Sequence, residues 1–329
     1  MRAKSIPLLL AISALFIASC GKGVGGRGTK TMGDAQSDDG TSRSGAPVLT
    51  VTIEPLRYFT EAIAGDRFRV VSMVPRGSSP ETYDPTPQQL ISLANSRAYL
   101  RIGHIGFERT WCERLAQNAP DLPFLDMSQG IDFIRGAAHH HAHHAASDSS
   151  STPDEASGSD AHGGDDLAIE PHIWNSPTNA RIIARNIADA LSRLDPPHAA
   201  AYRLRSDSLC TAIARTDSLV RTILSDPGAD RAFLIYHPAL SYFAREYGLR
   251  QFAIEADGKE PSPAHLAEII ETCASEGIRV VFIQPEFDRR NAELIARQTH
   301  CELISIDPLA YDWHAQMLRT AQALAHHLP

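Results

Sequence analysis

The sequence lacks the features of several large classes of protein. Its positive charge is not in excess, because 31 Lys and Arg face 39 Asp and Glu and leave a net charge of −8. That balance argues against a nucleic-acid-binding protein. There is no paired CxxC spacing of the kind that builds a zinc ribbon, no HExxH and no GxSxG. With 43% hydrophobic and 21% charged residues, the composition is that of a globular protein.

The N-terminus has the pattern of an export signal, which we place at residues 1–19. A short basic start precedes the apolar run Ile6–Ile17, which is too short to span a bilayer at about 20 residues. Small residues then lead to Cys20, in an arrangement that resembles the lipobox of bacterial lipoproteins, in which this cysteine carries the lipid. Residues 20–47, rich in Gly, Ser, Thr and Asp, predict a flexible tether. The alternative is an ordinary signal peptide with a chance cysteine.

Strand-like and helix-like segments alternate from residue 48 onward, in both halves of the chain. The predicted strands are Val48–Ile53, Phe68–Val74, Ala98–Ile102, Pro123–Leu125, Ala232–Tyr236, Gln251–Ile254, Val280–Ile283 and Leu303–Ile306. Such alternation predicts an α/β fold with two lobes, each a mostly parallel sheet flanked by helices. We place the N-terminal lobe at 48–196 and the C-terminal lobe at 226–329. Residues 197–225 between them have helical spacing and predict a long, rigid linking helix.

A segment that cannot build a core interrupts the first half. Residues 137–166 are rich in Ser, Asp and His, and predict a disordered His-rich loop. Its imidazoles favour zinc, copper or nickel, so we predict secondary metal capture; a spacer or a proton buffer is the alternative. The histidines concerned are His139, His140, His141, His143, His144 and His162.

Four candidate metal ligands lie at or near the ends of predicted strands, where α/β lobes place ligands. They are Glu81, His172, His237 and Asp307. Two imidazoles and two carboxylates form a suitable first shell for a divalent transition metal, and the two carboxylates cancel its charge. A proline lies directly beside each of the four candidate ligands and stiffens the loop that positions it.

Other polar residues carry weaker signals. Cys273 and Cys301 could form a disulfide in an exported protein, or stay reduced. Cys112 and Cys210 are interpreted as free thiols. Glu255 is interpreted as a solvated surface carboxylate, with a contact to the lobe interface or the permease as the alternative.

The motifs together resemble the metal-binding solute-binding proteins of bacterial ABC importers, the zinc/manganese group that is ZnuA/TroA-like (cluster A-I). The resemblance covers about residues 48–329. It is carried by Thr52–Phe59 with Gly65-Asp66, Val74–Pro87, Ile102-Gly103 with Gly106-Phe107-Glu108, Glu170–Trp174, His237-Pro238 with Tyr242–Ala244, Gly258–Pro263 and Ile306–Leu309. It implies one metal buried in the cleft between the lobes, with His172, His237 and Asp307 on family ligand positions. The family usually has His where this chain has Glu81, so Glu81 is either a ligand that favours harder metals or is replaced by water or a loop His.

The N-terminal pattern predicts an exported protein that lipid holds to a membrane, in the periplasm or at the cell surface, and we expect a monomer. The resemblance implies that it captures Zn²⁺ and delivers it to an ABC permease. A manganese or iron importer component of the same family is the alternative, because two carboxylates suit those metals too. A zinc metallohydrolase is a further alternative, but a catalytic zinc usually has three protein ligands and an open position. We therefore predict a binding protein and no enzyme.

Overall fold

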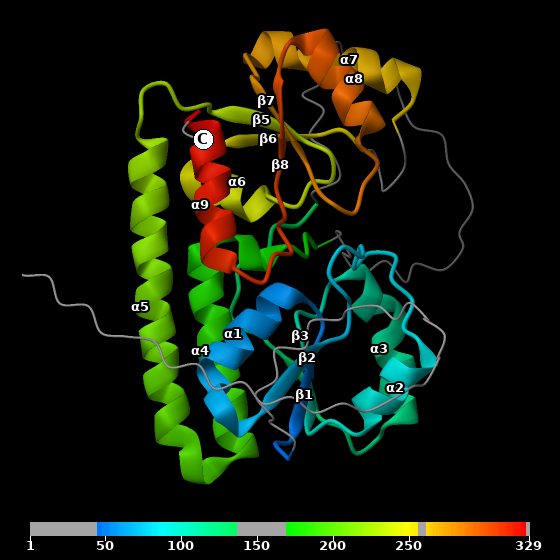
Figure 1. The fold of residues 1–329 in the computed structure, drawn as a ribbon, viewed down its shortest axis with the longest axis vertical. Coiled ribbons are helices and arrows are strands. Elements are labelled where there is room, and N and C mark those ends of the chain that lie inside the picture. The colour runs from blue at the N-terminus through cyan, green and yellow to red at the C-terminus, as the bar shows by residue number, and fades with distance from the viewer. Residues whose placement is uncertain (1–44, 137–168, 256–260, 327–329) are drawn as a thin grey trace, which may run out of the picture. The chain divides into compact units, whose positions relative to one another are not determined.

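The computed structural model describes residues 45–136, 169–255 and 261–326, and its fold is shown in Figure 1. The strands are β1 (Val48–Val51), β2 (Arg69–Ser72), β3 (Ala98–Arg101), β4 (Phe124–Asp126), β5 (Ala232–Ile235), β6 (Arg250–Ala253), β7 (Val280–Ile283) and β8 (Glu302–Ser305). The α-helices are α1 (Glu54–Ala64), α2 (Pro87–Ala94), α3 (Gly106–Asn118), α4 (Pro177–Leu194), α5 (Ala199–Leu224), α6 (Ser241–Tyr247), α7 (Pro263–Glu276), α8 (Arg289–Thr299) and α9 (Trp313–Leu324). Short 3₁₀ turns are η1 (Gly65–Arg67), η2 (Ile173–Asn175) and η3 (Pro196–His198).

The strands form two parallel sheets of the same topology. The first has the order β2-β1-β3-β4 and the second the order β6-β5-β7-β8. In each sheet the order reverses beside the first strand, between β1 and β3 and between β5 and β7. The carboxyl ends of strands at such a reversal are where open α/β sheets bind ligands. The predicted fold class, α/β with two parallel-sheet lobes, is confirmed.

The second sheet is covered on both faces because its strands alternate between two cores. Phe233 and Ile235 of β5 belong to the main hydrophobic cluster. Ala232 and Leu234, on the other face of the same strand, pack in a second cluster with Ile269 of α7. All four β5 side chains are buried. A strand buried on both faces is nearly continuous in apolar residues, which is why it is readable from the sequence.

The main cluster is shared by both lobes and by the helices between them. It contains Leu49 of β1, Ile213 of α5, Phe233 of β5 and Leu324 of α9. The predicted long helix is present as α5, and it packs against α1, α4 and α9. The lobes are therefore joined by one continuous apolar core, and a linking helix is only one part of that connection.

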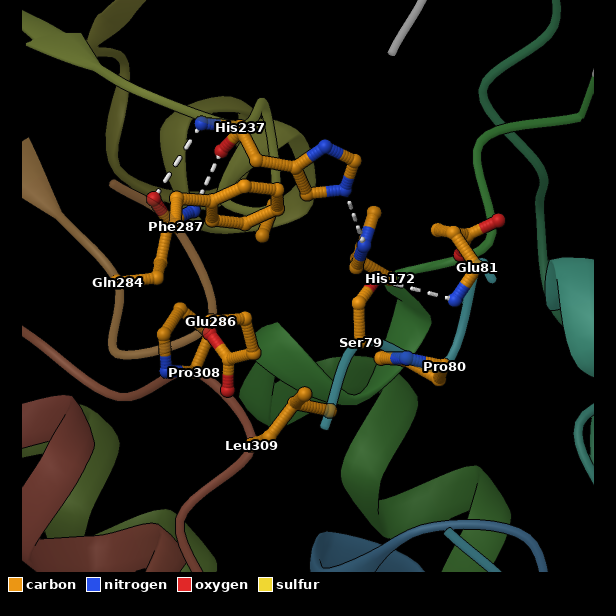
Figure 2. Close-up of a pocket in the computed structure, with 11 residues that line it drawn as sticks. Ser79, Pro80, Glu81, His172, His237, Gln284, Glu286, Phe287, Pro308 and Leu309 are labelled. Carbon is orange, nitrogen blue, oxygen red and sulfur yellow. Dashed lines mark hydrogen bonds between the residues drawn. The ribbon is translucent and has the colours of Figure 1, made fainter. Parts of the chain in front are cut away.

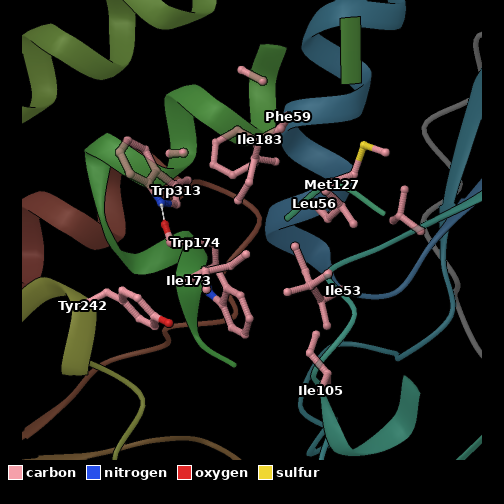
Figure 3. Close-up of a cluster of buried hydrophobic side chains, with 14 of the residues drawn as sticks. Ile53, Leu56, Phe59, Ile105, Met127, Ile173, Trp174, Ile183, Tyr242 and Trp313 are labelled. Atoms are coloured by element: carbon pink, nitrogen blue, oxygen red, sulfur yellow. Dashed lines mark hydrogen bonds between the residues drawn. The ribbon is translucent and has the colours of Figure 1, made fainter. Parts of the chain in front are cut away.

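Two indole rings fix the turn that precedes α4 to the C-terminal lobe. Trp174 Nε1 donates to the Pro308 carbonyl at 2.8 Å, and Trp313 Nε1 donates to the Trp174 carbonyl at 2.7 Å. Both rings are buried, and Figure 3 shows them beside Ile173 and Phe59. Asn175 adds a third bond, from its Nδ2 to the Ala239 carbonyl at 2.9 Å. These bonds position the segment that carries His172.

Some predictions fall outside the described residues. They are the export signal at 1–19, the lipidation site Cys20, nearly all of the tether at 20–47, and the loop at 137–166 with its six histidines. In the part of the chain that the structure describes, no helix is both long and apolar enough to cross a membrane.

Cys273 and Cys301 lie next to each other as buried free thiols. The Cys301 thiol accepts a hydrogen bond from Cys273, which lowers the pKa of Cys301 below its ordinary value. A disulfide between them stays a prediction. Cys112 and Cys210 are also free thiols, as expected.

We expect Trp174→Phe to lower the free energy of unfolding by about 1–3 kcal/mol, because the buried Pro308 carbonyl loses its donor. Urea denaturation followed by circular dichroism measures this change. Trp111→Phe is the matched control, because its indole donates to Asp84 at an exposed site and should cost no more than about 0.5 kcal/mol. Equal losses in the two variants would contradict the role given to Trp174.

Candidate metal centre

Two imidazoles from different parts of the fold face each other. His172 precedes η2, and His237 follows β5 at the carboxyl edge of the second sheet. Their Nε2 atoms are 3.2 Å apart, and Figure 2 shows the rings meeting through these atoms. Two nitrogens on one tetrahedral zinc, each at 2.0–2.1 Å from it, are separated by about 3.3 Å. The pair therefore has the spacing of two ligands of one cation.

Each imidazole is held at its Nδ1 atom by a buried carboxylate. Glu170 Oε1 bonds to Nδ1 of His172, and Glu255 Oε1 bonds to Nδ1 of His237, both at 2.5 Å. Because Nδ1–H donates to the carboxylate, the neutral ring keeps its lone pair on Nε2, where a metal would bind. The interpretation of Glu255 as a surface carboxylate is wrong, since only 5% of it is exposed. Glu255 is buried because of its contact with His237, and the position of Glu255 after β6 does not indicate that contact.

The buried pair of Glu170 and His172 shifts the pKa of both groups. Burial opposes charge on the His172 ring, but the Glu170 carboxylate outweighs it and raises the pKa of His172. Burial likewise opposes charge on Glu170, but the charge of His172 and hydrogen bonds from the His172 ring, the His172 amide and the Ser241 hydroxyl lower the pKa of this carboxyl. Glu170 is therefore an anion that favours positive charge at the imidazole, whether the charge is a proton or a metal ion.

The backbone and ring of His237 are also fixed by the turn between β7 and α8. Gln284 Nε2 donates to the His237 carbonyl at 2.6 Å, and Gln284 Oε1 accepts from the His237 amide at 3.3 Å. Phe287 stacks on the imidazole with a centroid distance of 5.4 Å and an interplanar angle of 23°. Sequence reasoning missed both residues, because neither is a metal ligand by type.

Glu81 lines a cavity together with His172 and His237, but its carboxylate points to a neighbouring loop. Its Oε2 accepts from the Gly106 amide at 3.0 Å, while in the described part of the chain its buried Oε1 has no hydrogen-bond partner. A Cβ on Gly106 would lie 2.5 Å from that Oε2 and 2.6 Å from the Glu81 carbonyl oxygen. Gly106 is therefore required for the close approach of the two segments.

Glu108 anchors the loop that contacts Glu81. Its carboxylate accepts from the amides of Ile102 and Gly103 and from the Thr52 hydroxyl. Burial raises the pKa of Glu108 to about 7. This buried carboxyl joins the carboxyl ends of β1 and β3.

Asp307 follows β8 and lies near the cavity, but it is not among the residues that form its wall. Its Oδ1 accepts from the Leu309 amide at 3.0 Å, and burial raises the pKa of its carboxyl. The wall is formed by Ser79, Pro80, Glu81, His172, His237, Ala239, Gln284, Glu286, Phe287, Pro308 and Leu309.

The structure thus brings three of the four predicted ligands, Glu81, His172 and His237, to one cavity, and only the two histidines contact each other directly. Among residues 45–136, 169–255 and 261–326, no three His, Cys, Asp or Glu side chains are close enough to hold one metal ion. Glu81 and Asp307 each bond to a backbone amide instead. The donor set still suits a divalent cation, since two nitrogens are spaced for one ion and an orphaned carboxylate oxygen is buried beside them.

Comparison with known proteins identifies the family. The family model described as zinc-uptake complex component A, periplasmic, matches residues 49–326. The chain belongs to this family. The high-affinity zinc uptake system protein ZnuA of Bacillus subtilis is 27% identical over 294 residues, which cover 88% of this chain and 83% of the relative.

Solved structures agree with this assignment. A crystal structure of ZnuA has a TM-score of 0.73 and 33% identity, and covers 85% of this chain and 98% of that one. A ZnuA deletion mutant with zinc bound has a TM-score of 0.72 and 33% identity, with coverage of 85% and 97%. The resemblance inferred from the motifs is confirmed: this is a metal-binding solute-binding protein of the ZnuA/TroA family.

We expect Gly106→Ala to disturb the site more than the fold, because the added methyl group displaces the segment that carries Glu81. Its metal affinity should fall by about 10-fold or more, measured by calorimetric titration with Zn²⁺. Gly45→Ala, where a Cβ meets nothing within 4 Å, should bind as the unmodified chain does. Unchanged affinity in Gly106→Ala would show that the position of Glu81 does not affect binding.

Proposed function

We propose that this chain captures Zn²⁺ outside the cytoplasm and delivers it to an ABC permease for import. The observation that carries this proposal is the facing pair of imidazoles, with their Nε2 atoms 3.2 Å apart. Each ring is held by a buried carboxylate, an arrangement typical of histidines that bind zinc. Membership of a zinc-uptake family supports the same cargo.

The proposed ligands are His172, His237, Glu81 and Asp307. The imidazoles need no rearrangement. Glu81 would offer the buried Oε1 that has no partner among the described residues, whereas Asp307 would turn toward the cation from outside the cavity wall. Two carboxylates neutralise the 2+ charge, which lowers the cost of enclosing the ion. Four protein ligands leave zinc no open position for a water nucleophile, so we propose a receptor and not a hydrolase.

The remaining parts of the proposal concern segments outside the described residues. Lipid on Cys20 would hold the protein at a membrane as a monomer. The histidines of the loop at 137–166 would gather zinc weakly, since nothing in that composition preorganises a site. Manganese or iron is the second candidate cargo, because Glu81 adds an oxygen donor where the family resemblance implies His.

The test is calorimetric titration of the lipid-free mature protein with Zn²⁺ and Mn²⁺. We expect tight zinc binding that weakens by about 10-fold or more in Glu81→Ala, because an anionic ligand is lost. Glu113→Ala, on the exposed face of α3 in the same lobe, is the control and should bind normally.

Three results would change the proposal. A preference for Mn²⁺ would favour the alternative cargo, and no tight binding of either metal would overturn the receptor role. Zinc binding untouched by Glu81→Ala would remove Glu81 from the ligand set.

The same titration on a chain without residues 137–166 should give fewer zinc ions per chain with the tight site unchanged, and an unchanged stoichiometry would exclude the loop as a capture site.

Zinc affinity should fall as the pH drops, because protons and zinc compete for the Nε2 atoms of His172 and His237. The pKa of His172 is raised above the ordinary value of 6.5. Its charged form therefore persists to higher pH, and affinity is lost as the pH falls through this raised value. Competition against a chelator at a series of pH values from about 8 to about 5 measures the effect. A constant affinity over this range would contradict imidazole ligation.

A further inference from the structure

Glu286 is a third acidic side chain beside the cavity, and the sequence analysis did not single it out. It follows β7, the strand next to β5, at the point where the order of the second sheet reverses. Its side chain lines the same cavity as Glu81, His172 and His237. Figure 2 shows it on the opposite side of the cavity from Glu81, near Pro308.

The turn that carries Glu286 is tied to His237 on both sides of the glutamate. Gln284 bonds twice to the His237 backbone, and Phe287 stacks on the His237 ring. The Phe287 amide also bonds to the Gln284 carbonyl at 3.3 Å, which closes the turn. The position of Glu286 relative to His237 is therefore fixed by the fold.

The carboxyl of Glu286 lies at the cavity wall and is half-buried. Burial raises the pKa of this carboxyl. Asp307 itself is outside the cavity wall with one oxygen bonded to the Leu309 amide. Of Glu286 and Asp307, Glu286 is the one that lines the cavity.

We propose that Glu286 is a metal-selectivity residue, whose carboxylate binds the divalent cation held by His172 and His237 as an additional oxygen donor. This inference rests on the proposed function of the cavity as the metal site. Zinc is satisfied by four ligands, whereas manganese prefers more, and harder, oxygen ligands. A further carboxylate therefore strengthens Mn²⁺ binding more than Zn²⁺ binding, and it makes the site less selective for zinc.

The test compares the unmodified chain with Glu286→Gln by calorimetric titration with Mn²⁺ and Zn²⁺. We expect Mn²⁺ affinity to fall by about 10-fold or more, with a smaller loss for Zn²⁺. Glu271→Gln, at an exposed position on α7 of the same lobe, is the control and should change neither. Thermal unfolding without metal checks that the variants fold alike.

Two further measurements separate ligation from a general effect of charge. Glu286→Asp keeps the charge but shortens the side chain, so it should lose Mn²⁺ affinity as Glu286→Gln does. Co²⁺ is the spectroscopic probe, because its visible absorption strengthens when the coordination number falls toward four. We expect stronger Co²⁺ absorption in both variants than in the unmodified chain.

The outcomes distinguish this inference from the proposed function. Metal binding by the unmodified chain that is unaltered in Glu286→Gln would overturn the role of Glu286 and leave the receptor role standing. Equal losses for both metals, with Glu286→Asp and the Co²⁺ spectrum unchanged, would also overturn it, since charge alone would then explain the effect. An unmodified chain that binds no divalent cation would overturn both.

Discussion

The site depends on two hydrogen bonds that hold two imidazoles from behind. Glu170 and Glu255 each accept from Nδ1 of a histidine, and this directs both Nε2 atoms to one point. Unheld, His172 and His237 would lose side-chain rotamer freedom on binding a cation, a cost of the order of 1 kcal/mol per side chain. Because the fold has already fixed the rings, this entropy is lost when the chain folds and not when the metal binds.

The fold can hold this geometry because the lobes share a core. His172 precedes α4, which packs against α1 of the first lobe and α5, while His237 follows β5 of the second lobe. Trp174, two residues after His172, bonds across to Pro308, and Asn175 bonds to Ala239. The two histidines are thus connected by buried hydrogen bonds as well as by the metal they are proposed to share. A site built between loosely joined lobes could not keep its nitrogens at this spacing.

Much of this arrangement could be predicted from the sequence, for physical reasons that also explain the failures. Fully buried strands such as β5 and β7 are continuous apolar runs, so the two sheets and their order along the chain were readable. Of the two candidate histidines, His237 stands in a proline-bordered turn after such a run, whereas His172 directly precedes η2 and follows no such strand. Glu255 and Glu286 were missed, because a carboxylate after a strand has the same local pattern whether it faces solvent or a histidine. Which of the two such a carboxylate faces depends on the order of the strands in the sheet. No local segment of the sequence indicates that β5 pairs with both β6 and β7.

The imidazole nitrogens are held by buried carboxylates, whereas the carboxylate oxygens of Glu81 and Asp307 are held less firmly. This difference affects which metal the site prefers. Glu81 and Asp307 each have a bond from one backbone amide, worth about 1.5–3 kcal/mol for a charged acceptor. A structural zinc site gains about 10–16 kcal/mol on binding, so even the loss of both amide bonds would be a small term. The imidazole pair would then be common to any cargo, while the number of carboxylates that turn toward the ion would differ with its size and hardness. Selectivity in this protein is accordingly expected to lie in its oxygens, and the substitution of Glu81 for the usual histidine and the added Glu286 act in the same direction.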